Sequence, residues 1–564
     1  MATREREMPT ADRPVAPDAA THEVFNQPPP LEGYNAYAAD TALREALHRE
    51  GGGWGEQRLQ RFGEIAGGEL LEVGRQANEN PPRLRAFDRY GHRIDEVEFH
   101  PAYHRCMGIA KEHGLHSLAW TAQREGAQVV RSALIYLHNQ FEAGSMCPIT
   151  MTHASVPALR HQSDVAEAWL PKILADVYDP ACRPAPEKAG LTVGMGMTEK
   201  QGGSDVRANT TRARPLGRGG PGGEYTLVGH KWFFSAPMCD AFLVLAHTER
   251  GLSCFLLPKW RPDGTRNPIQ IQRLKDKLGD RSNASSEVEF RGAFGWMLGE
   301  AGRGVPTILE MVAQTRLDCM LGSSGLMRQA LVQALHHCRH REAFGKRLLD
   351  QPLMGNVLAD LALESEAAMA LSMRTARAFE EAARGEEHGT LLARIMTPVG
   401  KYWICRRTPV QVNEAQECLG GAGYVEDHMM PRLYRQAPLN SIWEGSGNVQ
   451  CLDMLRAMQR SPECVEALLA ELRSVAGENP HYDAHLREVR AMLGERGELQ
   501  ARARRLVEKT ALALQASVLI RSGNAALSDA FCAARLGGDA GLALGTLPPG
   551  SGLDAIVERA APGL

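Results

Sequence analysis

The sequence predicts an α+β protein in which a small β-rich domain lies between two helical domains and a further helical region follows. Apolar residues recur at spacings of three and four from about residue 36 to 190 and again beyond about 303, as amphipathic helices require. The intervening stretch holds short runs rich in β-branched and aromatic residues, separated by turn sequences. The length of 564 residues exceeds that of one ordinary domain.

We expect five parts along the chain. They are an N-terminal arm, an N-terminal helical domain, a central β domain, a helical bundle and a C-terminal helical extension, which cover residues 1–35, 36–190, 191–302, 303–458 and 459–564. The proline-rich arm is either a disordered tail or a segment that packs on a neighbouring subunit through its apolar residues Val24, Phe25 and Leu31.

Local signals refine these parts. In the β domain, GRGGPGGE precedes a strand and lacks the order of a phosphate-binding loop, so it predicts a hairpin turn. The bundle contains three long helical patterns, and Pro398 and Pro409 are expected to kink or break the third. The extension predicts three more helices, one of which runs without interruption from LREVR to LIRSG.

Composition excludes several classes of function. A net charge of −3 gives the chain no overall basic field, so contact with nucleic acid requires a local basic patch. No segment is long and apolar enough to span a membrane, and the first residues do not form a signal peptide. The twelve cysteines include no C-x-x-C pair, so we expect no metal site, and scattered thiols suit the reducing cytoplasm.

Three stretches carry the functional signal: GMGMTEKQGGSDV in the β domain, REAFGKRLLDQPLM in the bundle, and LGGAGY followed by NSIWEGSGNVQ near its end. No G-x-G-x-x-G lies between a strand and a helix, so a Rossmann nicotinamide site is not expected. The order and spacing of the three stretches resemble the acyl-CoA dehydrogenase superfamily over roughly residues 40–458. RLKDKLGDRSNASSEVEF, SIWEGSGNVQCLDMLR and the extension are similar to its AidB branch, which is associated with the bacterial response to DNA alkylation.

The resemblance implies that FAD binds between the β domain and the bundle. Backbone N–H groups, small hydroxyls and aromatic rings would line the flavin on the β side, and the matching residues are Met197, Thr198, Gly203, Ser204, Phe233, Phe234 and Ser235. A second motif, usually supplied by a neighbouring subunit, matches Arg341, Phe344 and Gln351. Further cofactor contacts are implied for Gly420, Gly421, Trp443, Gly445, Ser446 and Asn448. Taken singly, these residues also fit an ordinary β core, a solvated helix face and plain turns.

Glu444 matches the catalytic base of many family members. In that chemistry a glutamate removes the α-proton of an acyl thioester while the flavin accepts the β-hydride. Trp443 would provide an apolar wall beside the carboxylate. Arg316 matches a family arginine near the base, and it either balances the charge of Glu444 or belongs to a salt bridge within the bundle. Family members commonly carry Tyr and Thr where this chain has Trp443 and Ser446, which places rapid acyl-CoA turnover in doubt.

Basic residues in and beside the extension form the second candidate site. The AidB resemblance implies that they bind duplex DNA through its phosphates, without reading the base sequence. The candidates are Arg456, Arg502, Arg504, Arg505, Lys509 and Arg521. A solvated helix face is the alternative, because Glu498 and Glu508 dilute the positive charge.

We therefore expect a cytoplasmic, homotetrameric flavoprotein that holds FAD, has weak isovaleryl-CoA-like dehydrogenase chemistry and binds double-stranded DNA as part of the response to alkylation. The alternative is a catabolic dehydrogenase for a short or branched acyl-CoA. Such an enzyme would pass electrons to an electron-transfer flavoprotein and would have no role at DNA.

Overall fold

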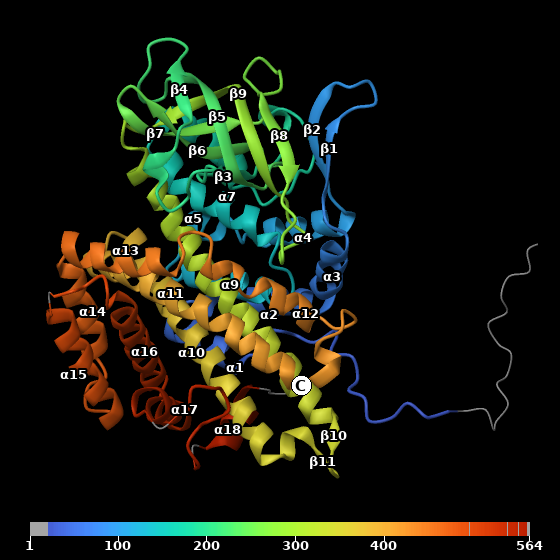
Figure 1. Cartoon of the computed structure of the whole chain (residues 1–564), viewed down its shortest axis with the longest axis vertical. Helices are drawn as coiled ribbons and strands as arrows, with labels where there is room; N and C mark the ends of the chain where they lie inside the picture. Colours follow the sequence, from blue (N-terminus) through green and yellow to red (C-terminus); the bar gives the residue numbers. More distant parts are fainter. Residues whose placement is uncertain (1–20, 496, 539, 551, 561–564) are drawn as a thin grey trace, which may run out of the picture.

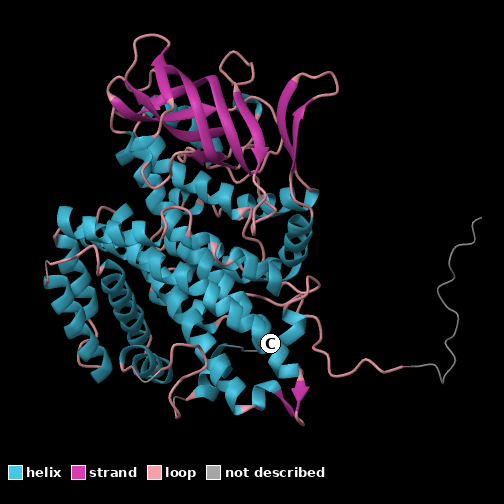
Figure 2. Ribbon diagram, viewed as in Figure 1, coloured by secondary structure: helices cyan, strands magenta, loops and turns pink. Residues whose placement is uncertain are grey.

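The computed structural model describes residues 21–495, 497–538, 540–550 and 552–560, and its architecture confirms the predicted fold class. A β domain lies at one end, the N-terminal helices lie beneath it, and the long bundle helices and the extension fill the other end (Figure 1, Figure 2). Residues 1–20 of the predicted arm lie outside the described residues. No helix within those ranges is long and apolar enough to cross a membrane.

Helices dominate the N-terminal domain, and side-chain caps fix where two of them begin. The Asp40 carboxylate accepts a hydrogen bond from the Leu43 N–H, and His100 caps a helix whose first residue is proline. The helices are α1 (Thr41–Arg49), α2 (Glu56–Ile65), α3 (Leu71–Glu79), α4 (Pro101–Glu112), α5 (Leu118–Thr121), α6 (Ala127–Asn139), α7 (Met146–Leu159) and α8 (Ser163–Ile173).

A two-stranded hairpin interrupts these helices and was not expected from the helical spacing of the region. It consists of β1 (Arg83–Phe87) and β2 (Arg93–Glu98), which pair antiparallel. Both strands are short and rich in charged residues, so they lack the apolar alternation by which a half-buried strand is found. Arg93 donates a hydrogen bond to the Ile271 carbonyl at 3.1 Å, which attaches the hairpin to the β domain.

Seven strands form the sheet of the β domain, in the order β3-β5-β4-β6-β7-β9-β8. Additional pairings of β3 with β6 and of β5 with β9 curl this sheet. The GRGGPGGE segment joins β4 to its antiparallel neighbour β5, which confirms the predicted hairpin turn. The strands are β3 (Val193–Gly196), β4 (Arg212–Pro215), β5 (Glu224–Ser235), β6 (Ala241–Thr248), β7 (Gly251–Pro258), β8 (Ile269–Leu274) and β9 (Ser285–Leu298).

Three long helices form the bundle: α9 (Gly304–His340), α10 (Pro352–Ala383) and α11 (Glu387–Glu417). Between α9 and α10, the two-residue strands β10 (Glu342–Ala343) and β11 (Lys346–Arg347) form a small hairpin. After α11, the bundle continues with α12 (Met430–Gln436) and α13 (Gly447–Arg460).

The two prolines of α11 do not break this helix, so that part of the prediction is wrong. Pro398 and Pro409 both lie inside its continuous span. The threonine before each proline donates its hydroxyl to the carbonyl four residues earlier, from Thr397 at 2.6 Å and from Thr408 at 2.9 Å. Because α11 packs against α9 and α10, tertiary contacts outweigh the local cost of each proline.

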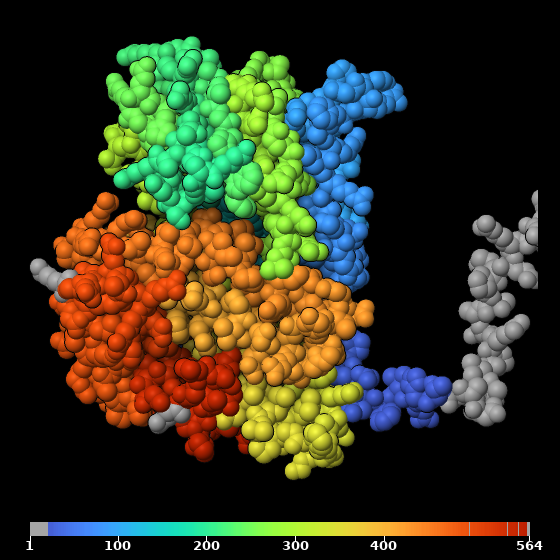
Figure 3. Space-filling model, in the orientation of Figure 1, coloured from blue at the N-terminus to red at the C-terminus, as the bar shows by residue number. Residues whose placement is uncertain are grey.

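The extension contains five α-helices within the described residues, rather than the three predicted. The run expected as one helix ends at Gly494 and resumes at Ala503, because the intervening ERGEL segment carries a glycine and charges without apolar spacing. The helices are α14 (Glu463–Arg473), α15 (Pro480–Gly494), α16 (Ala503–Arg521), α17 (Ala525–Phe531) and α18 (Leu553–Ala560). Figure 3 shows the extension in orange and red against the lower part of the molecule.

Buried charges attach the extension to the bundle. Arg535 forms an ion pair with Glu364 at 2.9 Å and another with Asp360, and both carboxylates belong to α10. Arg374 of α10 likewise binds Glu471 of α14 at 2.8 Å. Apolar residues of α16 and of the bundle helices belong to one continuous core. The extension is therefore an integral part of the bundle.

We predict that Arg535→Ala destabilises the protein by about 3–5 kcal/mol, because it leaves the buried Asp360 carboxylate without a cation and leaves Glu364 with Arg407 alone. Urea unfolding measures this loss as a lower midpoint. The matched control is Arg347→Ala, whose partner Asp350 is exposed, and its effect should stay below about 1 kcal/mol. Equal midpoints for the two variants would contradict the structural role of the Arg535 pair.

Candidate functional site

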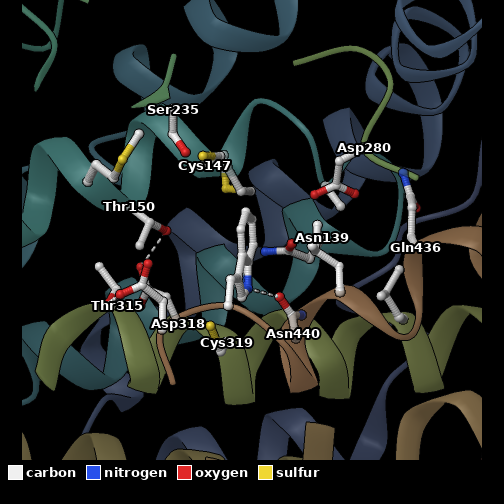
Figure 4. Close-up of a pocket in the computed structure, with 17 residues that line it drawn as sticks. Asn139, Cys147, Thr150, Ser235, Asp280, Thr315, Asp318, Cys319, Gln436 and Asn440 are labelled. Carbon is white, nitrogen blue, oxygen red and sulfur yellow. Dashed lines mark hydrogen bonds between the residues drawn. The ribbon is translucent and has the colours of Figure 1, made fainter. Parts of the chain in front are cut away.

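A cleft of about 620 Å³, counted with its opening to solvent, lies where the β domain meets the bundle. Its wall includes Ser235 from the end of β5, Thr315 from α9, and Trp443 and Glu444 from the loop before α13. Figure 4 shows side chains from the two domains directed toward one another across this space. The structure therefore brings the predicted base and part of the predicted flavin wall into one cavity.

Glu444 is held in a backbone conformation that is rare for a residue with a side chain. Its φ is +57°, and that of Gly445 is +97°. A non-glycine residue in this left-handed region carries strain of about 1–3 kcal/mol, which persists only where the surroundings fix it. The Thr315 hydroxyl donates to Glu444 Oε2 at 2.7 Å and so orients the carboxylate at the cleft wall.

Cationic and amide side chains hold the carbonyl oxygens around this strained residue. The buried Lys401 ammonium donates to the carbonyls of Trp443 and Gly445, each at 2.6 Å. Gln450 donates to the Glu444 carbonyl at 3.1 Å and to that of Gly445 at 2.9 Å. Three consecutive carbonyls are thus fixed from inside the bundle, which compensates the strain at Glu444.

Arg316 supports the same loop, although not by pairing with the Glu444 carboxylate. Its Nε donates to the Glu444 backbone carbonyl at 3.0 Å, and its Nη1 lies 2.7 Å from Asp453 Oδ2. Asp453 also pairs with Arg394 at 2.9 Å. The structure therefore shows the bundle salt bridge, the second of the two alternatives considered for Arg316, together with a bond to the backbone of the base.

The predicted flavin-contacting residues of β5 lie on two opposite faces of this strand. Ser235 lines the cleft and Phe233 is half exposed, whereas Phe234 is fully buried against Phe242 and Phe290. Successive side chains of a strand point to opposite faces, so the Phe234 ring belongs to the β core and cannot line the face that Phe233 and Ser235 present. The Phe234 ring is therefore turned away from that face, and a cofactor contact at this position stays a prediction.

The other β-side residues follow β3. Met197 and Thr198 are partly buried, while Gly203 and Ser204 lie in the loop that follows. A Cβ atom on Gly203 would lie 2.7 Å from the Thr198 hydroxyl oxygen, so the absence of a side chain permits this close turn.

A buried ion pair fixes the position of this loop relative to β5. The Lys231 ammonium lies 2.8 Å from Glu199 Oε1, and both side chains are fully buried. Glu199 also accepts hydrogen bonds from the hydroxyls of Thr210 at 3.0 Å and Thr211 at 2.6 Å. Burial alone raises the pKa of the Glu199 carboxyl, but Lys231 and these donors outweigh it and lower the pKa to about 2.

Another group of predicted cofactor residues lies at the far end of α9. Thr315 and Arg341 are separated by about 39 Å along this helix, given its rise of about 1.5 Å per residue. The Phe344 side chain is fully exposed, and Gln351 donates to the Ala343 carbonyl at 3.1 Å. Arg341 donates to the Asn26 carbonyl at 2.6 Å, which binds the N-terminal arm. The structure does not bring this group to the Glu444 cleft of the same chain.

Gly420 and Gly421 also lie at this end of the molecule, just after α11. The Cys338 thiol, near the end of α9, contacts the carbonyl of Cys418 at 3.9 Å. Gly420 has a φ of +59°, and a Cβ atom on either glycine would meet no atom within 4 Å. The two glycines therefore present open backbone next to the end of α9.

The loop after Glu444 reaches the extension through one hydrogen bond. Ser446 directly precedes α13, and Asn448 lies in the first turn of that helix. Asn448 Oδ1 accepts from Arg504 Nε at 2.8 Å. Arg504, predicted to bind DNA, thus contacts a residue predicted to bind the cofactor.

Most of the predicted DNA-binding residues have acidic partners within the protein. Arg505 and Lys509 both pair with Glu488, at 3.3 and 2.9 Å, and Arg502 pairs with Glu495. Arg521 lies at the opposite end of α16 and binds the buried Glu471 at 2.6 Å, so it is not part of a stripe with the others. Arg456, on α13, is exposed.

Several residues that build the cleft were not found from the sequence. Thr315, Lys401 and the Glu199–Lys231 pair act through contacts between segments far apart in the chain. A signal did exist for the lysines, because both interrupt apolar runs, GHKWFF and PVGKYWIC, where a charged residue must find a buried partner. Asp280 and Gln436, which also line the cleft, gave no signal beyond a polar loop and a helix end.

Family comparisons match most of the chain. Residues 26–180 match the N-terminal domain of the adaptive response protein AidB. Residues 194–293 and 302–459 match the middle and C-terminal domains of acyl-CoA dehydrogenase. The Escherichia coli (strain K12) protein AidB is 49% identical over 481 residues, which span 85% of this chain and 88% of that protein. Caenorhabditis elegans acyl-CoA dehydrogenase family member 11 is 31% identical over 76% of this chain and 71% of that protein.

Solved structures are similar over comparable lengths. The structure of Bd2924 in its apo form has a TM-score of 0.81 and 30% identity, covering 89% of this chain and 100% of that one. Caenorhabditis elegans ACDH-11 in complex with C11-CoA also has a TM-score of 0.81, with 27% identity over 96% of this chain and 93% of that one.

We predict that part of the protein's stability is lost as the pH falls from about 4.5 to about 2. The folded pKa of Glu199 lies below its ordinary value of 4.5, so its contribution is complete above pH 4.5 and disappears as the folded carboxyl takes up a proton. Urea midpoints measured across this range test the effect. Glu199→Gln should be less stable at pH 7 and should lack this part of the acid dependence; an unchanged acid profile would exclude the ion pair as its source.

Proposed function

This chain belongs to the AidB branch of the acyl-CoA dehydrogenase family, and from that premise we propose an FAD-dependent oxidoreductase with weak, isovaleryl-CoA-like dehydrogenase chemistry that also binds duplex DNA. A cytoplasmic role in the response to DNA alkylation is part of the proposal. The observation that carries the enzymatic part is the carboxylate of Glu444, fixed at the wall of a cleft between the β domain and the bundle.

The residues around the cleft fit a flavin ring. Ser235 offers a hydroxyl at the cleft wall, Phe233 leaves an aromatic face half exposed, and Met197 and Thr198 follow the adjacent strand β3. Small hydroxyls and backbone N–H groups are the donors that a flavin edge accepts, and aromatic walls exclude water. These residues would hold the ring, and bound FAD would supply a hydride acceptor.

The two separated groups of cofactor residues support assembly into a homo-oligomer. An FAD molecule held at the Glu444 cleft cannot also reach Arg341 of the same chain, about 39 Å away along α9. Phe344 is fully exposed, and the backbone at Gly420 and Gly421 is open. Residues of one subunit that complete the site of another would account for this arrangement. The homotetramer implied by the family resemblance is part of the proposal.

Glu444 would act as the general base on an acyl thioester. Its carboxylate accepts one hydrogen bond, from Thr315, and retains lone pairs for the α-proton. Lys401 and Gln450 hold the carbonyls of the loop, so the carboxylate cannot turn away without breaking several hydrogen bonds. Trp443, whose indole N–H donates to Asn440 at 2.8 Å, stands beside the base and keeps that part of the cleft narrow.

The DNA-binding part of the proposal rests on fewer residues than the sequence suggested. Arg456 and Arg505 are exposed, and the side chain of Arg505 is 70% accessible despite its contact with Glu488. Phosphate contacts from such arginines give affinity without sequence readout.

The extensive pairing of the basic residues weakens the argument for DNA binding. The alternative function is a catabolic acyl-CoA dehydrogenase that passes electrons to an electron-transfer flavoprotein and has no DNA role. The two functions differ in measurable ways. Rapid reduction of an electron-transfer flavoprotein by the substrate-loaded enzyme would support the catabolic function. Salt-dependent binding of duplex DNA would support the leading proposal.

We predict that Glu444→Gln abolishes bleaching of the flavin absorbance by isovaleryl-CoA, because the amide keeps the shape of the side chain but cannot accept the α-proton as a carboxylate does. The loss should be about 100-fold or more in the rate of reduction. Stopped-flow absorbance measures this rate. Purified wild type and variant should both be yellow and release FAD on denaturation.

The control for this experiment is Glu417→Gln, a change of the same kind at the exposed end of α11. It should leave the reduction rate unchanged. Equal rates for wild type and Glu444→Gln would exclude Glu444 as the base, and a colourless protein that takes up no added FAD would refute the cofactor assignment.

We predict that reversing the charge of two exposed arginines, Arg456→Glu and Arg505→Glu, weakens binding to duplex DNA. Removing one arginine–phosphate interaction lowers the log–log dependence of affinity on salt by about 0.9, so the slope should fall by about 2 for the double variant. Fluorescence anisotropy on random duplexes at several salt concentrations measures it. Arg504 is left unchanged because it contacts Asn448.

The matched control makes the same charge change on the β domain, at the exposed Arg214 and Arg218. That variant should bind DNA as the wild type does. If both double variants weaken binding equally, the effect is one of net charge, and the extension is not the binding surface.

A further inference from the structure

A second acidic side chain lines the same cleft as Glu444. Asp280 lies in the loop between β8 and β9, is 4% exposed and has a φ of +49°. Among the residues that the structure describes, none donates a hydrogen bond or forms an ion pair with its carboxylate. Because the carboxylate lines the cavity without a donor from the described residues, a ligand in the cleft can supply the N–H donors that its oxygens accept.

The environment of Asp280 explains why its charge is not satisfied within the protein. The neighbouring acid Glu142 accepts hydrogen bonds from Ser282 at 2.6 Å and from the backbone N–H groups of Gly144 and Ser145. Asp280 has no such donors. Burial raises the pKa of the Asp280 carboxyl to about 6, while the nearby Lys277 lowers it and Glu142 raises it further.

A polar side chain close to Asp280 has a hydrogen-bond donor without an acceptor. Gln436, the last residue of α12, is 3% exposed and lines the cleft, and its amide nitrogen has no acceptor among the described residues. Gly279 brings the two segments together, because a Cβ atom there would lie 2.5 Å from the Arg435 carbonyl oxygen and 2.8 Å from the Gln436 Cα. Figure 4 shows Asp280 and Gln436 on one side of the cavity, with Thr150, Thr315 and Asp318 on the other.

We propose that Asp280 and Gln436 form a specificity subsite that binds a carboxamide-like group of the substrate, whose N–H donates to Asp280 and whose carbonyl oxygen accepts from Gln436. This inference rests on the proposed function, since it takes the cleft as the acyl site. It names the substrate class as an acyl thioester with a terminal carboxamide, in place of a plain hydrocarbon chain. An anionic end group is disfavoured, because it would place two negative charges together in a buried site.

Three CoA thioesters of nearly the same shape test the subsite on the FAD-loaded protein. Glutaramyl-CoA ends in a carboxamide, isoheptanoyl-CoA ends in an isosteric hydrocarbon and glutaryl-CoA ends in a carboxylate. Calorimetry should show the tightest binding for glutaramyl-CoA, by about tenfold or more over isoheptanoyl-CoA, and the weakest for glutaryl-CoA. Equal affinities for the three thioesters would overturn the proposal.

The decisive variant is Asp280→Asn, because asparagine tolerates the left-handed backbone and keeps the size of the side chain. It should reduce the preference for glutaramyl-CoA by about tenfold and improve the binding of glutaryl-CoA. The matched control is Asp276→Asn, an exposed carboxylate of the same loop, which should leave the order of affinities unchanged. A preference that survives in Asp280→Asn would overturn the proposal.

Two readouts do not depend on thioester binding. Without ligand, Asp280→Asn should have a Tm no lower than that of the wild type, since no hydrogen bond or ion pair of the described residues is lost, whereas a structural role for Asp280 predicts a lower Tm. Free glutaramide should raise the Tm of the wild type and not that of Asp280→Asn. If no thioester binds but glutaramide does, the proposed function fails and the subsite stands.

The remaining alternative is that Asp280 and Gln436 contact FAD and not the acyl substrate. FAD affinity is measured by fluorescence for the wild type and Asp280→Asn, and the subsite predicts equal values. If the variant loses FAD affinity about tenfold while the order of thioester affinities stays unchanged, Asp280 contacts the flavin and the proposal is overturned.

Discussion

The buried ammonium of Lys401 is the contact on which the geometry of the candidate active site depends. It binds the carbonyls on both sides of Glu444 and so holds that residue in a left-handed conformation which the chain would otherwise avoid. A charged group in this position is itself stable only because the two carbonyls replace its water. The two hydrogen bonds therefore offset both the strain at the acid and the burial of the lysine, and neither residue is easily changed alone.

Buried ion pairs also connect the other parts of the molecule. The Glu199–Lys231 pair locks the loop after β3 onto β5, and the pairing of Arg535 with Asp360 and Glu364 locks the extension onto α10. Each pair connects segments that are distant in sequence, and each would leave an unpaired buried charge if one partner moved. The cleft is thus framed by elements whose relative positions are fixed by charge as well as by apolar packing.

The spacing of apolar residues was sufficient to predict the order of helical, β and helical domains, because a long amphipathic pattern depends only on neighbouring residues in the sequence. It failed where packing overrides local preference, as at Pro398 within α11, and where a strand is short and charged, as in β1. For the site, motifs placed Ser235 and Glu444 together, but Thr315 and Lys401 reach Glu444 and its neighbours across 129 and 42 residues of sequence. Such contacts depend on helix packing, which spacing in a single sequence does not encode. The domain boundaries and the roles of the site residues stay predictions.

The hydrogen bond from Arg504 to Asn448 makes the extension and the loop of the base thermodynamically linked. Any ligand that draws Arg504 away from Asn448 alters the free energy of the loop, and therefore the affinity of whatever the loop holds. Linkage is reciprocal, so a molecule bound beside Glu444 changes the affinity of the extension for its own ligand by the same factor. In such a protein, a ligand bound in the cleft would change the affinity of the α16 surface for its own ligand.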